Sequence, residues 1–208
     1  MSAVALLLAA AAAAGPPATA VEAERRFAAD AQADGMWTAF RRWSTPEAVM
    51  FDPKPVRAHK LLRNRADPPV SLRWWPSESW VSCDGTTAIN TGGWMGGAGG
   101  GYIVTVWVRQ SDGGWKWVYD GGDVAETIPP MVAEPVLHRA ACGAATAPAA
   151  AVVEGERGEG ASPDLTLAWR WHVADDGSRL FTAWTWDGAR HAVALENRAA
   201  PPKPAARP

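Results

Sequence analysis

From residue 70 onward, apolar and polar side chains alternate along most of the chain, which is the pattern of half-buried β-strands. The clearest run covers residues 102–110, where Val104, Val106 and Val108 fall on one face. Asp-Gly pairs interrupt the alternation at 84–85, 112–113, 176–177 and 187–188, and such pairs favour hairpin turns. This part of the chain is therefore expected to fold as antiparallel β-meanders.

Before residue 70 the apolar spacing is helical. Val21, Phe27 and Ala31 recur near a period of 3.6, and Asp34-Gly35 is a natural end for this helix. A second helix is predicted over 36–43, followed by a short strand at 47–51 and a short helix within 56–65. Helices that precede an antiparallel meander indicate the α+β class.

The first 20 residues resemble a signal peptide. Residues 4–14 are apolar, a Gly-Pro-Pro sequence ends that run, and Ala-Thr-Ala at 18–20 predicts cleavage after Ala20. No Lys or Arg precedes the run, so the alternative is an Ala-rich disordered N-terminus. With export we expect a periplasmic or secreted protein that has no membrane span in its mature form.

Charge and cysteine content exclude several classes of protein. With 20 Lys+Arg against 22 Asp+Glu, the chain lacks the basic excess of a general nucleic-acid binder. Two cysteines exclude a disulfide-dense scaffold and a four-cysteine zinc site. Cys83 and Cys142 either form a disulfide, worth roughly 4 kcal/mol in the chain-entropy model, or remain a buried strand thiol and an unpaired loop thiol.

Two helices over 21–43, the sequence PEAVMFDP at 46–53 and GGWKWVYDGGD at 113–123 resemble the nuclear-transport-factor-2-like superfamily, which includes SnoaL-like proteins and ketosteroid isomerase. The resemblance covers residues 21–124. It implies N-terminal helices packed in a strongly curved antiparallel sheet, a cone with an apolar cavity, and a possible homodimer through the sheet. The expected organisation is a signal peptide at 1–20, the cone at 21–124, an Ala/Pro/Gly-rich connector at 125–163, a three-strand antiparallel β-meander at 164–198 and a disordered tail at 199–208.

Aromatic side chains are the distinctive feature of the expected cone, since the chain has 13 Trp. They either fill the cavity as core or line it as a site for a flat, apolar ligand. The expected ligand-binding residues are Phe40, Trp43, Met50, Phe51, Trp75, Trp94, Tyr102, Trp107 and Trp117.

Three residues are candidates for catalysis. A carboxylate at the cavity, Asp52 or Asp120, would be desolvated and act as a general base, and Tyr102 would donate a hydrogen bond to an oxyanion. Each also has a structural interpretation: Asp52 as a turn residue, Asp120 as part of a Gly-Gly loop, and Tyr102 as core. We expect no cofactor and no metal, because the four His form no HxH or HxxxH pair.

Three functions therefore remain open. The first is an exported protein that binds a small apolar ligand in the cavity. The second is an isomerase, hydrolase or dehydratase that uses a cavity Asp and Tyr. The third is an envelope interaction or carbohydrate-binding module that uses Trp169, Trp184 and Trp186 of the last meander.

Overall fold

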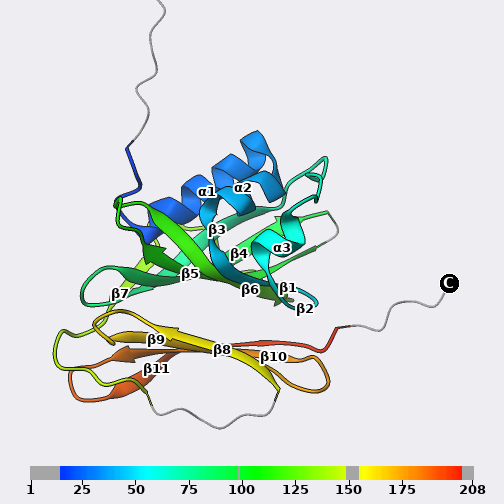
Figure 1. The fold of residues 1–208 in the computed structure, drawn as a ribbon. Coiled ribbons are helices and arrows are strands. Elements are labelled where there is room, and N and C mark those ends of the chain that lie inside the picture. Colours follow the sequence, from blue (N-terminus) through cyan, green and yellow to red (C-terminus); the bar gives the residue numbers. More distant parts are fainter. Residues whose placement is uncertain (1–14, 98, 149–154, 203–208) are drawn as a thin grey trace, which may run out of the picture.

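The computed structural model describes residues 15–97, 99–148 and 155–202, which form three layers. Helices cover one face of a seven-stranded sheet, and a four-stranded sheet covers the other face (Figure 1). The elements are α1 (Ala20–Asp34), α2 (Met36–Trp43), β1 (Ser44–Asp52), β2 (Lys54–Arg57), α3 (Ala58–Leu62), β3 (Arg73–Val81), β4 (Thr87–Gly96), β5 (Gly99–Arg109), β6 (Trp115–Val124), β7 (Val136–Arg139), β8 (Glu156–Ala161), β9 (Leu167–Val173), β10 (Arg179–Trp186) and β11 (His191–Ala199).

The expected fold class, an α+β cone with N-terminal helices in a curved antiparallel sheet, is wrong. Strands hold 47% of the described residues and helices 15%, so this part of the protein is mainly β. Its first sheet is mixed, because β1 pairs in parallel with β6 and β3 pairs in parallel with β7. Alternation along a strand shows which side chains share a face, but it does not select the neighbouring strand, and for this reason the pairing was mispredicted.

The seven-stranded sheet has the order β2-β1-β6-β5-β4-β3-β7. Its centre is the antiparallel meander β3-β4-β5-β6 that the alternation predicts. β3 runs through Pro76, with a register shift between Pro76 and Glu78. Because β7 pairs only with Glu78–Val81, Pro76 lies outside that ladder, and beside it the side chains of Trp75 and Ser77 donate to the carbonyls of Pro129 and Pro130.

The last meander has four strands rather than three, in the order β11-β10-β9-β8. The additional strand, β8, and the short strand β7 both lie in the segment expected to be a connector. Glu, Gly and Ala are poor strand formers, so β8 is visible only through its pairing with β9. The glycines of β8 have a function in packing, because a Cβ on Gly160 would meet Cζ2 of Trp169 at 2.2 Å.

The predicted Asp-Gly turns are confirmed. Gly85, Gly113, Gly177 and Gly188 all have positive φ, between 69° and 105°, a conformation that is cheap for glycine and costly for other residues. These turns fix the hairpin registers and therefore the face on which each side chain lies.

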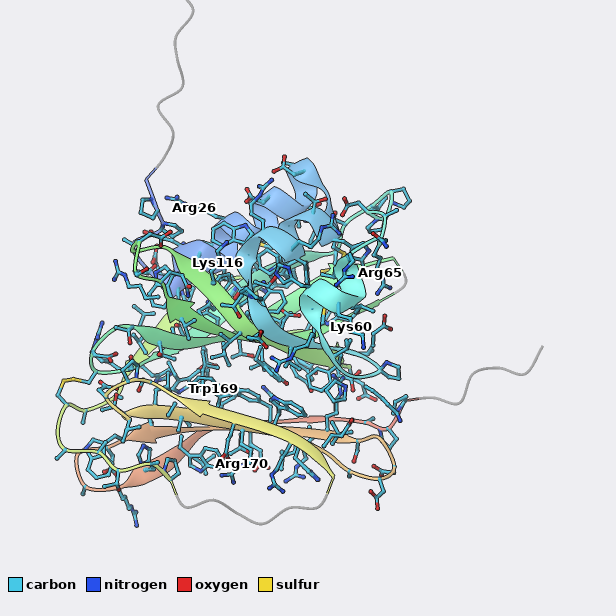
Figure 2. The ribbon with its side chains drawn as sticks, viewed as in Figure 1. Arg26, Lys60, Arg65, Lys116, Trp169 and Arg170 are labelled. Carbon is cyan, nitrogen blue, oxygen red and sulfur yellow. A yellow bond between two sulfur atoms is a disulfide. The ribbon has the colours of Figure 1, made fainter. Side chains whose placement is uncertain are left out.

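Two apolar cores result, one on each face of the seven-stranded sheet. Trp107 and Trp117 are fully buried with Phe27 of α1 on the helix side. Val104 and Val106 of β5 face the other way and pack with Phe181 of β10, as the alternation predicts. The same alternation operates in β9: Figure 2 shows Trp169 between the sheets and Arg170 on the outer face.

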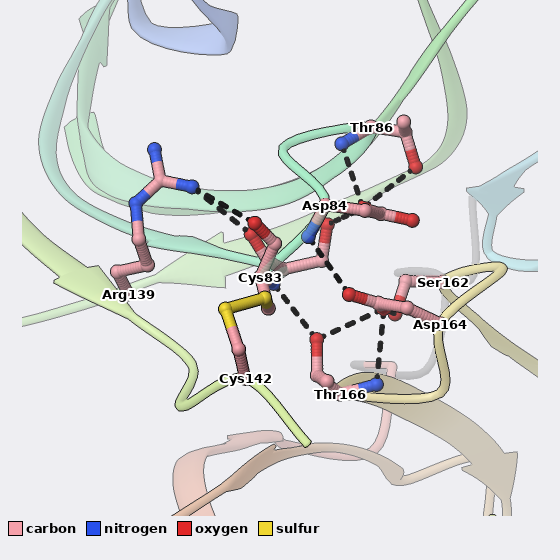
Figure 3. Close-up of a disulfide and its surroundings, with 9 residues drawn as sticks. Cys83, Asp84, Thr86, Arg139, Cys142, Ser162, Asp164 and Thr166 are labelled. Atoms are coloured by element: carbon pink, nitrogen blue, oxygen red, sulfur yellow. Dashed lines mark hydrogen bonds between the residues drawn. A yellow bond between two sulfur atoms is a disulfide. The ribbon is translucent and has the colours of Figure 1, made fainter. Parts of the chain in front are cut away.

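A disulfide and two turns of the same design lie where the two sheets meet (Figure 3). Cys83 and Cys142 are bonded, with their Cα atoms 5.2 Å apart. Residues 82–87 and 162–167 form turns of the same design, in which Asp84 and Asp164 each accept a Ser hydroxyl, a Thr hydroxyl and a Thr N–H. The Cys83 N–H donates to Thr166 Oγ1 at 2.8 Å, and the Asp84 N–H donates to Asp164 Oδ2 at 2.8 Å.

The ends of the chain bear on three predictions. The apolar run at 4–14 lies outside the described residues, as does the tail at 203–208. Cleavage after Ala20 and export stay predictions; in the structure Ala20 begins α1, which Thr19 caps by accepting the Glu22 N–H.

No helix in the described residues has the length and apolar character needed to cross a membrane. The outer face through which a homodimer was expected is covered by β9 and β10.

Candidate functional site

A cavity of about 180 Å³ lies between α2 and the helix-covered face of the seven-stranded sheet. Its wall is mostly apolar and aromatic, as in most small-molecule sites. One carboxyl group, that of Asp120, belongs to it, and none of the described residues that line it carries a positive charge. The lining residues are Met36, Trp37, Phe40, Met50, Leu72, Trp74, Trp94, Tyr102, Ile103, Asp120, Gly121 and Gly122.

Glu24 is a fully buried carboxyl group beneath this cavity. It sits on the core-facing side of α1, one turn before Phe27. Its Oε1 accepts the Trp74 indole N–H at 2.9 Å, and its Oε2 accepts the Trp107 indole N–H at 2.7 Å and the Asn90 amide at 3.3 Å. Burial raises the pKa of Glu24, and these hydrogen bonds oppose the rise.

Asp120 is the second acid of this region and belongs to the cavity wall. It lies on β6 directly opposite Thr105 of β5, whose hydroxyl donates to Asp120 Oδ2 at 3.4 Å. Burial is the main cause that raises the pKa of Asp120 to about 8, and the nearby Glu24 carboxylate adds to the rise. Near neutral pH the Asp120 carboxyl is therefore mainly protonated.

Thr105 connects the two acids. Its buried hydroxyl interacts with Glu24 as well as with Asp120. Because two carboxylates in one apolar core repel each other, ionisation of Glu24 disfavours ionisation of Asp120. The site thus combines an apolar cavity with a pair of interacting buried acids.

The predicted ligand-binding residues are divided among four places. Phe40, Met50 and Trp94 line the cavity, and Tyr102 borders it. Trp107 and Trp117 are fully buried core residues, and Trp43 is half-buried at the side of that core, where its indole N–H donates to Asp30 at 2.8 Å. Phe51 and Trp75 lie elsewhere: Phe51 contacts Tyr119 and Trp171 between the sheets, and the Trp75 indole donates to the Pro129 carbonyl.

The three predicted catalytic residues do not converge. Asp52 is exposed and forms an ion pair with Arg65 at 2.7 Å. Tyr102 belongs to the face of β5 that packs on the second sheet, and burial together with the Asp123 carboxylate raises the pKa of its phenol. Asp120 and Tyr102 both belong to the cavity lining, but Tyr102 also packs toward the second sheet, and Asp52 lies outside the cavity.

Sequence reasoning missed Glu24 and Trp37. Glu24 falls in the apolar row of α1, and a carboxylate in such a row is a signal of a buried acid that the sequence does contain. Trp37 follows Met36 at the start of α2, and the loop residue Leu72 closes the cavity from the other side. No periodic pattern in the sequence assigns Trp37 or Leu72 to a cavity.

A larger groove of about 580 Å³ runs between the edges of the two sheets, with Trp169 and Trp171 in its wall. It is open to solvent, and its rim carries charged side chains such as Arg57, which pairs with Glu47 at 3.0 Å. Burial raises the pKa of its lining residue Tyr119 further from neutrality, whereas the smaller cavity holds Asp120, whose raised pKa of about 8 lies near neutrality, so the smaller cavity is the stronger candidate site.

The described residues contain no group of three or more His, Cys, Asp or Glu side chains placed to hold a metal ion. Comparison with protein-family models finds no match, and comparison with curated proteins finds no significant similarity. The resemblance to the nuclear-transport-factor-2-like superfamily is therefore without family support and, with the mixed sheet and mainly β content, is withdrawn.

Proposed function

We propose that this protein binds a small, mostly apolar ligand in the cavity between α2 and the seven-stranded sheet. The observation that carries the proposal is the wall of this cavity, which joins aromatic and aliphatic side chains to the single carboxyl group of Asp120. The volume of about 180 Å³ limits the ligand to a small molecule or to one small group of a larger molecule.

The enzyme alternative has one observation in its favour, the raised pKa of Asp120. A carboxyl group with a pKa near the working pH is suited to general acid–base catalysis. Of its expected partners, Asp52 is ion-paired at the surface, and Tyr102, although it belongs to the lining, lies on the face of β5 that packs on the second sheet. We therefore favour binding over catalysis.

The carbohydrate-binding alternative draws on the outer face of the second sheet. Trp184 and Trp186 are half-buried there, and the Arg170 guanidinium lies 5.6 Å from the Trp184 ring. Trp169 faces the other way, into the space between the sheets. The expected row of three tryptophans is thus split, which weakens this alternative.

Saturation-transfer NMR with toluene, phenol and 3,3-dimethylbutan-1-ol tests the proposed function. We expect signal transfer to at least one of the three compounds in the wild type. Ile103→Phe, which adds volume to the cavity wall, should abolish this transfer while leaving the unfolding free energy within about 1.5 kcal/mol. If no compound binds the wild type, or if binding persists in the folded Ile103→Phe variant, the cavity is not the binding site.

A further inference from the structure

Besides Tyr102, which packs toward the second sheet, the aromatic residues of the cavity lining are Trp37, Phe40, Trp74 and Trp94. Phe40 lies at the centre of the group, with ring centroids 5.4 Å from Trp37 and 5.8 Å from Trp74, both edge to face. The indole N–H groups of Trp74 and Trp94 are already bound, to Glu24 and to the Asp123 carbonyl. These two residues therefore offer the cavity the apolar parts of their rings.

Aromatic faces attract cations, and one ring of this group already does so. The Arg65 guanidinium lies 4.5 Å from the centroid of Trp37. Several rings around one cavity are the usual means of recognising a methylated ammonium ion, which cannot form strong hydrogen bonds through its methyl groups. The aromatic wall thus suits a cation as well as a neutral apolar group.

The charges of the site decide between these two kinds of ligand. Asp120 belongs to the cavity wall and Glu24 lies behind Trp74, yet the donors that contact Glu24 are the neutral groups of Trp74, Trp107, Asn90 and Thr105. None of the described residues in the lining is basic. A buried carboxylate normally has a positive partner, and here a bound ligand is the group that can supply it.

From these observations, and resting on the proposed function, we propose that the ligand is a small organic cation, a methyl- or alkyl-substituted ammonium. Its charge pairs with the Asp120 carboxylate and its alkyl groups contact Trp37, Phe40, Trp74 and Trp94. A cavity of about 180 Å³ equals the liquid volume of roughly six water molecules at about 30 Å³ each, which accommodates a trimethylammonium group with a short substituent.

Binding of such a cation is coupled to the release of a proton. The charged group that acts on Asp120 is Glu24 of α1, and the Thr105 hydroxyl from β5 is its hydrogen-bond donor. Glu24 disfavours a negative charge on Asp120 and raises its pKa, whereas the Thr105 hydrogen bond lowers it. The cation selects the ionised form of Asp120, so its apparent affinity follows the ionised fraction and falls at low pH.

The test compares choline with 3,3-dimethylbutan-1-ol, in which a carbon atom replaces the charged nitrogen. We expect the wild type to bind choline at least tenfold more tightly than the alcohol at pH 9. The Kd for choline should rise about fivefold from pH 8 to pH 7 and about ninefold from pH 7 to pH 6, because the pKa of Asp120 is about 8. The Kd for the alcohol should be nearly independent of pH.

Two variants complete the test. Asp120→Asn should remove the preference for choline and its pH dependence while keeping the binding of the alcohol. Asp175→Asn makes the same chemical change at an exposed turn position and should behave as the wild type. Equal Kd values for the two compounds in the wild type would overturn the cation assignment and leave the proposed function standing, whereas the absence of binding by either compound would overturn both.

Discussion

Replacing Asp120 with Asn should stabilise the protein by an amount that grows with pH. Below about pH 4 the carboxyl is protonated in the folded and the unfolded states. Above that pH the unfolded chain releases the proton, whereas the folded chain holds it until about pH 8, since burial and Glu24 raise the pKa of Asp120. The folded state therefore binds more protons between these two values, and the unfolding free energy of the wild type falls as the pH rises through this window.

The size of the effect follows from the pKa. A change from 3.8 in the unfolded chain to about 8 in the folded protein corresponds to roughly 6 kcal/mol. Asp120 keeps part of its exposure through the cavity, so solvent screens the charge and we expect about 2–4 kcal/mol. Asp120→Asn removes the titration, and its stability relative to the wild type should increase by this amount between pH 4 and pH 8.

Urea unfolding of the wild type and of Asp120→Asn at closely spaced pH values measures this difference. Asp175→Asn, at the exposed turn position, serves as the matched control and should follow the wild type at every pH. Glu24 also has a raised pKa and is present in all three proteins, but because its charge acts on Asp120, the difference between the wild type and Asp120→Asn reports the titration of the pair. A difference between the wild type and Asp120→Asn that stays constant with pH would refute the assignment of a buried, protonated Asp120.

Three further results are expected. Cys83→Ser opens a loop of 59 residues and should lower the unfolding free energy by roughly 4 kcal/mol, and reduction of the wild type should have the same effect in a urea titration. Trp107→Phe removes a donor from the Glu24 carboxyl and should cost about 1.5–3 kcal/mol more than Trp117→Phe, since the Trp117 N–H has no partner; calorimetry checks this. Gly160→Ala should displace the indole that lies on β8, with a loss of about 1–3 kcal/mol and a shift of the fluorescence maximum, and a variant with wild-type values would contradict the packing.

Local structure was predictable wherever the spacing of side chains determines which residues share a face or form a turn. Val104 and Val106 share a face, as their period of two requires, and they pack on the second sheet. The Asp-Gly turns were predictable because Gly113 and Gly177 adopt positive φ at little cost. These are properties of neighbouring residues, and they do not depend on which distant strand comes to lie alongside.

The pairing of distant strands and the environment of the candidate site were harder to predict from the sequence. The parallel pairing of β1 with β6 joins Val49 to Tyr119, and no spacing within either segment encodes that choice. Asp120 was a candidate from the sequence, but its environment depends on Glu24, which approaches from α1. Asp52 follows an equally apolar strand and lies at the surface with Arg65. The difference between the two aspartates arises from tertiary packing alone.

The order of the layers along the chain has a consequence during synthesis. Val104 and Val106 leave the ribosome long before Phe181, the residue of β10 that packs with them. Until then the nascent chain presents an uncovered apolar sheet face, which is a typical starting point for aggregation. This face therefore stays uncovered over the interval between the completion of β6 and the emergence of β10.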